Sequence, residues 1–343
     1  MPITQSRMKI EVRRTQTAPE FLKYLELEQR HWGPFIDHRS TWVFRGHADA
    51  TWPLQPSAWR PMKNRLQKLK KILKPKIASL CYEDPNWSCF KSKMQRDRRM
   101  ASALQFAIEF VSVRQFCRLA NELGLNLATD GFFLQSDDIS LNAEVQRYAI
   151  HPGSSSNEDH DNIFQSHPFA IAQHHGIPTR LIDWTRNPLI AAFFAAEKES
   201  ASSDELCVWA IQRSSADQVE KHPHHWIEIP RSDDQYLHSQ HGVFTLNRSA
   251  LEYFMRVGEW PDFDINGMPH FPGQKVIFPK IRKITLPVSQ RKRLLEILYK
   301  RRLGRAQLMP TLDNVALAVK AVSYTHLRAH ETKANLVCRL LLE

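Results

Sequence analysis

Hydrophobic residues recur with helical spacing in several stretches of the first part of the chain. A helix is expected over residues 19–28, which has a proline in its first turn. Residues 63–80 are a basic helical stretch that Pro75 should interrupt. Residues 101–123 predict a long helix ended by Gly124. Because apolar side chains cover most of its circumference, we expect this helix at the centre of the core.

Runs of β-branched and aromatic residues predict strands, most of them in the second half of the chain. The first such run, 41–45, is closed by Gly46, as expected where a buried strand meets a turn. Further strands are expected at 206–211, 226–229, 242–246, 275–278 and 281–286.

Two short helices and a closing helix complete the pattern. Residues 168–175 precede Gly176, and 189–198 follow Asn187-Pro188, a favourable N-cap and first-turn pair. A last helix is expected over 289–302. Helices come first and strands mostly later, which favours an α+β fold over regular β-α-β alternation. We therefore predict a single compact mixed domain with a central sheet and helices before and between its strands.

The domain boundaries follow from changes in composition. We assign 1–38 to an N-terminal helical segment and 39–320 to the main domain. Inside that domain, 60–100 is a basic helical insertion, and 137–161, rich in Pro, Gly and Ser, is an exposed loop. Residues 321–343 read as the translation of sequencing adapters. We exclude them from fold prediction and expect the native sequence to end near Lys320.

Charge is concentrated in one part of the chain. The net charge of +11 becomes +10 without residues 321–343, so the basic character is intrinsic. The segment from Arg60 to Arg99 contains thirteen Lys or Arg and three acidic residues. The segment is either a solvated helical face or a surface that contacts a nucleic-acid backbone. The residues for the second interpretation are Lys68, Lys70, Lys71 and Lys74.

Other classes of protein are disfavoured. The chain has no run of 18 apolar residues and no signal-peptide core, so we expect a soluble, cytoplasmic protein that does not enter a membrane. Cys81, Cys89, Cys117 and Cys207 form no CxxC pair, which indicates neither a zinc site nor a disulfide framework. No metal site is predicted. Glycine motifs for phosphate or dinucleotide loops are absent as well.

Four blocks of sequence carry a resemblance to a known family. They are Phe44-Arg45-Gly46 with Trp52-Pro-Leu-Gln-Pro-Ser57 and Arg60, Gln173 to Thr185 with Asn187-Pro188-Leu189, Gln240 to Thr245, and Arg302-Leu303-Gly304 with Leu308 to Asp313. Together they resemble the FRG domain, which is named after the first triplet. The chain departs from the pattern at His47, where we expect Gln. The resemblance implies a soluble α+β module of bacteria and phages and implies no activity.

Arg45 is the first candidate for a ligand contact. It ends a buried strand, so its charge must be paired, with Asp183 or another acid, or must face an anionic ligand. Planar guanidinium donors suit a phosphate or a carboxylate. Thr179 and Arg180, in the connection after Gly176, are further ligand candidates, and so is Thr245 on a later strand.

His174, His175 and Asp183 are the candidates for catalysis. A histidine next to Thr179, Arg180 and an acid has the pKa range of a general base. The alternative is structural, with the histidines capping helix carbonyls and Asp183 accepting loop N–H groups.

Three functions remain compatible with these residues. The first is binding of an anionic nucleotide-like or nucleic-acid ligand. The second is an ADP-ribosyltransferase-like enzyme that uses NAD, in which Arg45-Gly46 and the strand with Thr245 are the first two elements by analogy. Its third element, a late glutamate, is missing, and Glu252 or Asp313 would have to replace it. The third is an interaction domain without catalysis. The cofactor, if any, and the oligomeric state do not follow from the sequence.

Overall fold

The computed structural model describes most of the predicted core. The described residues are 10–36, 39–61, 64–125, 127, 131–134, 141–145, 162–199, 202–213, 224–228, 240–263 and 280–319. The predicted strand at 275–278, most of the predicted loop at 137–161 and the tail at 321–343 lie outside these ranges.

A seven-stranded mixed sheet organises the fold, with strand order β1-β9-β6-β4-β5-β8-β7. Only β1 and β9 run parallel, and the other neighbours are antiparallel. The strands are β1 (Ile10–Arg14), β4 (Trp42–His47), β5 (Ile182–Thr185), β6 (Glu205–Gln212), β7 (His224–Ile227), β8 (Gly242–Asn247) and β9 (Ile281–Pro287). A separate two-stranded ladder joins β2 (Phe35–Ile36) and β3 (Arg39–Ser40).

The sheet is split between β4 and β5. Along β4, all six residues pair with β6, from Trp42 opposite Gln212 to His47 opposite Cys207. With β5, however, β4 shares a single pair, Phe44 opposite Thr185. The two strands therefore diverge beyond that pair, and side chains must fill or line the space that the missing ladder leaves.

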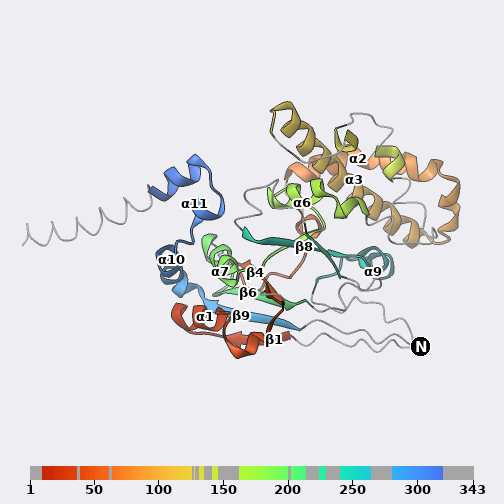
Figure 1. Ribbon diagram of the computed structural model, residues 1–343. Coiled ribbons are helices and arrows are strands. Elements are labelled where there is room, and N and C mark those ends of the chain that lie inside the picture. Colours follow the sequence, from red (N-terminus) through yellow and green to blue (C-terminus); the bar gives the residue numbers. More distant parts are fainter. Residues whose placement is uncertain are drawn as a thin grey trace, which may run out of the picture.

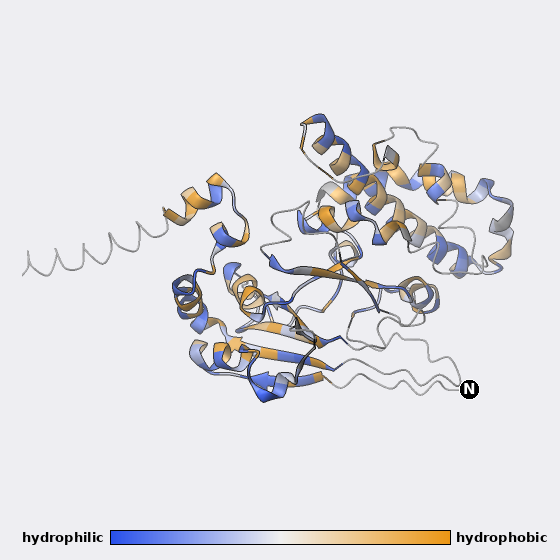
Figure 2. Cartoon of the chain, in the orientation of Figure 1, coloured by the Kyte–Doolittle hydropathy of each residue, from blue (hydrophilic) through white to orange (hydrophobic). Residues whose placement is uncertain are grey.

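Helices cover one face of the sheet. They are α1 (Ala18–Leu25), α2 (Asn64–Glu83), α3 (Lys93–Glu122), α6 (His167–His174), α7 (Pro188–Glu197), α9 (Ala250–Val257), α10 (Arg291–Lys300) and α11 (Arg305–Leu308). α1, α7 and α10 pack over β4, β6 and β9 (Figure 1). Figure 2 shows hydrophobic residues, in orange, on the central strands and on α7, as expected for a helix between a sheet and other helices.

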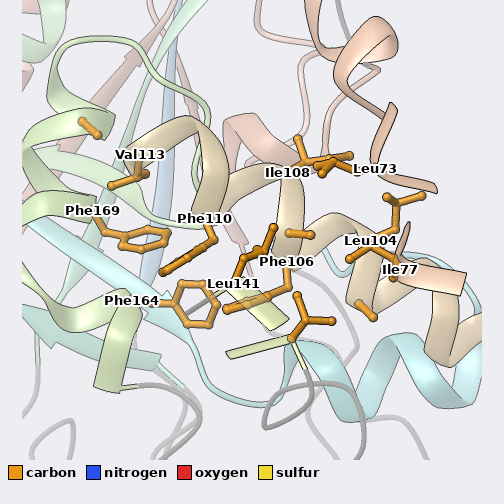
Figure 3. Packing of buried hydrophobic residues seen from close by; sticks show 14 of the residues in the cluster. Leu73, Ile77, Leu104, Phe106, Ile108, Phe110, Val113, Leu141, Phe164 and Phe169 are labelled. Atoms are coloured by element: carbon orange, nitrogen blue, oxygen red, sulfur yellow. The ribbon is translucent and has the colours of Figure 1, made fainter. Parts of the chain in front are cut away.

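A second core lies under α2, α3 and α6, which gather beside β8 (Figure 1). Four phenylalanine rings form its centre: Phe106 and Phe110 of α3, and Phe164 and Phe169 next to and within α6 (Figure 3). Leu73 and Ile77 of α2 join them, so α2 is anchored in the core by one face. On the opposite face of the sheet, a smaller cluster joins strand residues such as Val43 and Trp184 to loop residues such as Leu54.

The α+β class is confirmed, and the differences lie in individual elements. α2 continues through Pro75, because the buried residues on either side hold the helix where one backbone hydrogen bond is lost. α3 begins at Lys93, eight residues before the predicted start, behind a capping box formed by Ser92 and Gln95. Residues 141–145, predicted as exposed loop, form a helical turn whose Leu141 and Val145 are buried.

Several elements were not predicted, and three of them extend the main sheet or pack beside it. β1 adds a strand to the edge of the main sheet, β5 occupies part of what was read as a connection, and α9 follows β8. Among the helices in the described ranges, none combines the length and the apolar content of a membrane-crossing segment.

Candidate functional site

The Phe-Arg-Gly triplet lies on β4 at the split in the sheet. Phe44 is fully buried against α7, and Gly46, two residues on, faces the same helix. A Cβ atom on Gly46 would lie 2.0 Å from the carbonyl oxygen of Ala191 and 2.6 Å from the backbone nitrogen of Ala195. The glycine is therefore required for close packing of α7. Arg45 points to the other side of the strand, as the alternation of side chains requires.

Arg45 bridges the gap between β4 and β5. Its Nη1 donates to the carbonyl oxygen of Asp183 at 2.8 Å and to the Oδ2 atom of the same residue at 2.7 Å. Its Nε donates to Nε2 of His47 at 3.1 Å. These bonds fix the guanidinium in one orientation. Within the described residues, its Nη2 group donates to no side chain or carbonyl, so two N–H donors remain.

His47 supports the orientation of Arg45. Because a guanidinium only donates, Nε2 of His47 must accept, and the proton of the neutral ring lies on Nδ1. Burial, followed by the positive charges of Arg45 and Arg60, holds the pKa of His47 well below its ordinary value. The ring is 3% exposed, and Nδ1 is buried without a hydrogen-bond partner in the described part of the chain. His47 is therefore a neutral acceptor that positions Arg45.

Asp183 is held as a carboxylate. Burial raises its pKa, but the Arg45 guanidinium and the Gln173 amide outweigh that effect and lower the pKa below its ordinary value. Nε2 of Gln173 donates to Oδ1 of Asp183 at 2.7 Å. The side chain of Asp183 is 44% exposed and that of Arg45 16%, so the pair is open to the solvent. A carboxylate with a lowered pKa is a weak base and a firm anchor for the arginine.

Arg60 is the second guanidinium of the site. Its Nε and Nη2 both donate to the carbonyl oxygen of Gln55, at 3.1 and 2.7 Å. Its Nη1 donates to nothing among the described residues. Burial and the charge of nearby Arg45 lower the pKa of Arg60. Within the described ranges Arg60 forms no ion pair, and the carboxylate that acts on its pKa is Asp183, which is paired with Arg45.

These residues line a cleft of about 220 Å³ at the split in the sheet. Strand β4, the loop after it, β5, α6 and α7 all contribute. The cationic lining residues are Arg45, Arg60 and Lys198, and Asp183 is the one carboxylate among the described residues of the lining. The remaining side chains that matter here are His47, Trp52, His174 and Gln240. The cleft is therefore positively charged.

Thr179 and Arg180, both predicted to contact a ligand, are placed in other bonds. The hydroxyl of Thr179 donates to Oε1 of Gln173 at 2.9 Å, in a completely buried position. Arg180 forms a buried ion pair with Glu109 of α3, with Nε 3.1 Å from Oε2, and lies over the ring of Phe164. Neither residue lines the charged cleft. Both connect the β5 region to the helical core.

The other predicted residues are divided. His174 lines the cleft and contributes to lowering the pKa of Asp183, whereas the neighbouring His175 is exposed and stacks on Phe116. Thr245 is buried and accepts a hydrogen bond from the indole nitrogen of Trp184 at 2.9 Å, away from the lining of the cleft. The structure thus brings together Arg45, His174 and Asp183 from the predicted set.

The basic segment is only partly available to a partner. Arg96 donates to the carbonyl oxygen of Phe90, Arg98 caps the last carbonyls of α9, and Arg99 is buried. The four predicted nucleic-acid contacts, by contrast, are exposed on α2: Lys68, Lys70, Lys71 and Lys74. In the described ranges, no group of three or more His, Cys, Asp or Glu side chains could hold a metal ion.

Sequence reasoning missed His47, Arg60 and Trp52 as site residues. His47 carried a signal, because it is two positions after Arg45 on the same strand and therefore shares its face. Arg60 and Trp52 both belong to the first motif, but neither was assigned a ligand contact.

Comparison with known proteins agrees with the first two motifs. Residues 40–204 match the family model of the FRG domain. No curated protein and no solved structure matches the chain. The matched range contains Arg45, His47, Arg60, His174 and Asp183, so it supplies most of the cleft. Residues 40–204, which carry the split between β4 and β5 and the charged cleft, are an FRG domain.

Proposed function

We propose that the cleft binds the phosphate group of an anionic, nucleotide-like ligand. The observation that carries the proposal is the pair of guanidinium groups at its wall. Arg45 and Arg60 are close enough for one to lower the pKa of the other, and each keeps an amino group that bonds to nothing in the described residues. Arg45 and Arg60 are partly buried cations, and Asp183 is the one carboxylate in the described lining. Positive charge therefore remains in the cleft, and a bound anion would stabilise it.

The orientation of the two groups supports a phosphate in particular. Arg45 is held by His47 and Asp183, and Arg60 is held by the Gln55 carbonyl, so little freedom is lost when an anion binds. Each arginine presents free N–H donors of a planar guanidinium, and these suit the several acceptor oxygens of a phosphate. Lys198 at the end of α7 adds a third positive charge at the rim.

Titration calorimetry with inorganic phosphate and ribose 5-phosphate tests the proposal. Arg60→Ala should weaken the binding of both by about tenfold to a hundredfold, since a hydrogen bond to a charged group contributes ~1.5–3 kcal/mol. The matched control is Arg293→Ala, because Arg293 is an exposed arginine of α10 that pairs with Glu296 outside the cleft. If wild-type protein binds neither ligand, or if both variants weaken binding equally, the proposal fails.

The ADP-ribosyltransferase alternative has less support. It needs a carboxylate next to the ligand, and Asp183, which is paired with Arg45, is the single one in the described lining. Glu252 on α9 and Asp313 are exposed and do not line the cleft. The alternative would be favoured over simple binding if the wild-type protein consumes NAD and Arg45→Ala abolishes this activity without changing the free energy of unfolding.

A further inference from the structure

Trp52 stands at the rim of the charged cleft and is exposed. Its relative exposure is 38%, whereas Phe44 and Trp184, which line the same cleft, are buried. A single exposed aromatic side chain is ordinary on a protein surface. The place of Trp52 in the lining of the charged cleft is what makes it a candidate for a ligand contact. The electrostatic role of the cleft leaves this ring without a function.

The loop that carries Trp52 is fixed by hydrogen bonds. The buried carboxylate of Asp49 accepts from the backbone nitrogen of Thr51 at 2.7 Å and from the hydroxyls of Thr51 and Ser202, both at 2.6 Å. The backbone nitrogen of Trp52 donates to the carbonyl oxygen of Asp49 at 3.3 Å. The indole is thus presented by a held loop, and packing into the core does not determine its place.

His47 connects the indole to the guanidinium pair. Its ring centroid lies 6.1 Å from that of Trp52, and its Nε2 accepts from Nε of Arg45. His47 therefore lies next to both the indole of Trp52 and the guanidinium of Arg45. A nucleotide has the same arrangement, with an aromatic base and a phosphate joined through one sugar.

The size of the cleft agrees with this division. Pockets that enclose a complete small ligand usually have volumes of about 300–1,000 Å³. The volume here is about 220 Å³. A cleft of this size has room for a phosphate and its sugar and leaves the base outside, next to Trp52 in the lining.

We propose that Trp52 is a stacking platform for the base of a nucleotide whose phosphate lies between Arg45 and Arg60. The inference rests on the proposed phosphate site and adds a second contact to it. It also specifies selectivity: the site should prefer nucleotides to sugar phosphates and to inorganic phosphate, and the identity of the base should matter little, because every base has an aromatic face.

The test compares adenosine 5′-monophosphate with ribose 5-phosphate, which lacks the base. Stacking of one base on an aromatic side chain contributes a factor of about 5–150 in affinity. Wild-type protein should therefore bind the nucleotide more tightly than the sugar phosphate by a factor in that range. Trp52→Ala should remove the difference and leave the affinity for ribose 5-phosphate unchanged. Trp52→Phe, which keeps an aromatic face, should retain most of it.

Two controls separate the base contact from the phosphate contact. Arg60→Ala should weaken both ligands by the same factor, and Tyr82→Ala, which removes an exposed aromatic ring on α2, should change neither. Equal affinities of wild-type protein for the two ligands would overturn the stacking platform and leave the phosphate site standing. The same holds if Trp52→Ala weakens both ligands equally. Binding of neither ligand would overturn the proposed function itself.

Discussion

Gly46 should be the position in the first motif at which the smallest change has the largest effect on stability. Gly→Ala normally stabilises a chain slightly, by about 0.4–1 kcal/mol, because it restricts the unfolded state. Here the added Cβ would lie 2.0 Å from the Ala191 carbonyl oxygen and 2.6 Å from the Ala195 nitrogen. Ordinary contact begins near 3.4 Å, so α7 must withdraw by about 1.4 Å at Ala191.

The cost of that withdrawal can be worked from the contacts. Overfilling a packed core by one methyl group costs about 1–3 kcal/mol. Both obstructing atoms belong to the backbone of α7, which side-chain rotation cannot move, so we expect the upper end, about 3 kcal/mol. A loss of that size lowers the melting temperature of a chain of this length by roughly 4–5 °C. Ala191, Phe194 and Lys198 line the cleft and move with the helix, so phosphate affinity should also fall.

Urea unfolding followed by circular dichroism measures the free energy of unfolding directly. Gly131→Ala is the matched control, because a Cβ there meets nothing within 4 Å and its φ is not in the left-handed region. That variant should unfold like the wild type or at slightly higher urea. A Gly46→Ala protein as stable as Gly131→Ala would refute the close packing of α7 on β4.

The remaining predictions concern charged residues. Arg180→Ala should lower the free energy of unfolding by about 3–5 kcal/mol in the same assay, because it leaves Glu109 buried and unpaired, and adding Glu109→Gln should recover part of the loss. A loss below 1 kcal/mol would contradict the buried pair. His47 has a lowered pKa in the folded state, so its contribution to the free energy of unfolding is present above pH 6.5 and is lost as the pH falls below that value, by up to about 1.4 kcal/mol per pH unit. In His47→Gln, the urea midpoint should therefore depend less on pH between pH 7.5 and 5. The same pH dependence in the variant and the wild type would disprove this. If α2 contacts nucleic acid, the affinity for generic DNA should fall steeply as the salt concentration rises. Replacing four exposed lysines with Gln should reduce the slope of log K against log[salt] by up to about 3–4, and an affinity independent of salt would exclude the contact. The four are Lys68, Lys70, Lys71 and Lys74.

The elements that were predictable have strong local signals. α3 and α7 are long or capped apolar stretches, and Asn187 caps α7 as expected, with its Oδ1 accepting from the Leu189 nitrogen at 2.9 Å. β4 begins with the aromatic and β-branched residues Trp42-Val43-Phe44, and β6 is apolar without interruption from Leu206 to Ile211. In each case the preference of the segment itself agrees with the tertiary fold.

The elements that were missed depend on distant partners. β5 has four residues, one of them Asp183, and it becomes a strand because β8 pairs along its whole length. β1 is mostly exposed, and the alternation of Ile10-Glu11-Val12-Arg13 is too short to predict a strand alone, so its pairing with β9 defines it. Neither partner is close in sequence, and a local pattern contains no information about them.

The site shows the same division. That Arg45 needs a partner followed from its place on a buried strand, and Asp183 was one of the predicted partners. The sequence could not show that the pair lies in an open cleft, because the opening depends on the single pairing between β4 and β5. The sequence could not show the partner of Arg180 for a similar reason: Glu109 is 71 positions earlier, on a helix with no visible link to the motif.

The pairing of β1 with β9 sets the order in which the protein can fold during synthesis. The Thr15 hydroxyl donates to the Thr285 carbonyl, 270 positions later. At about 5–20 residues per second, a ribosome needs roughly ten seconds or more to supply that partner. Until then β1 has no neighbour, and β6, the next strand inward, lacks the strand that should cover its edge. Unpaired edges invite association with other chains, so expression should be most sensitive to temperature and chaperones during this interval.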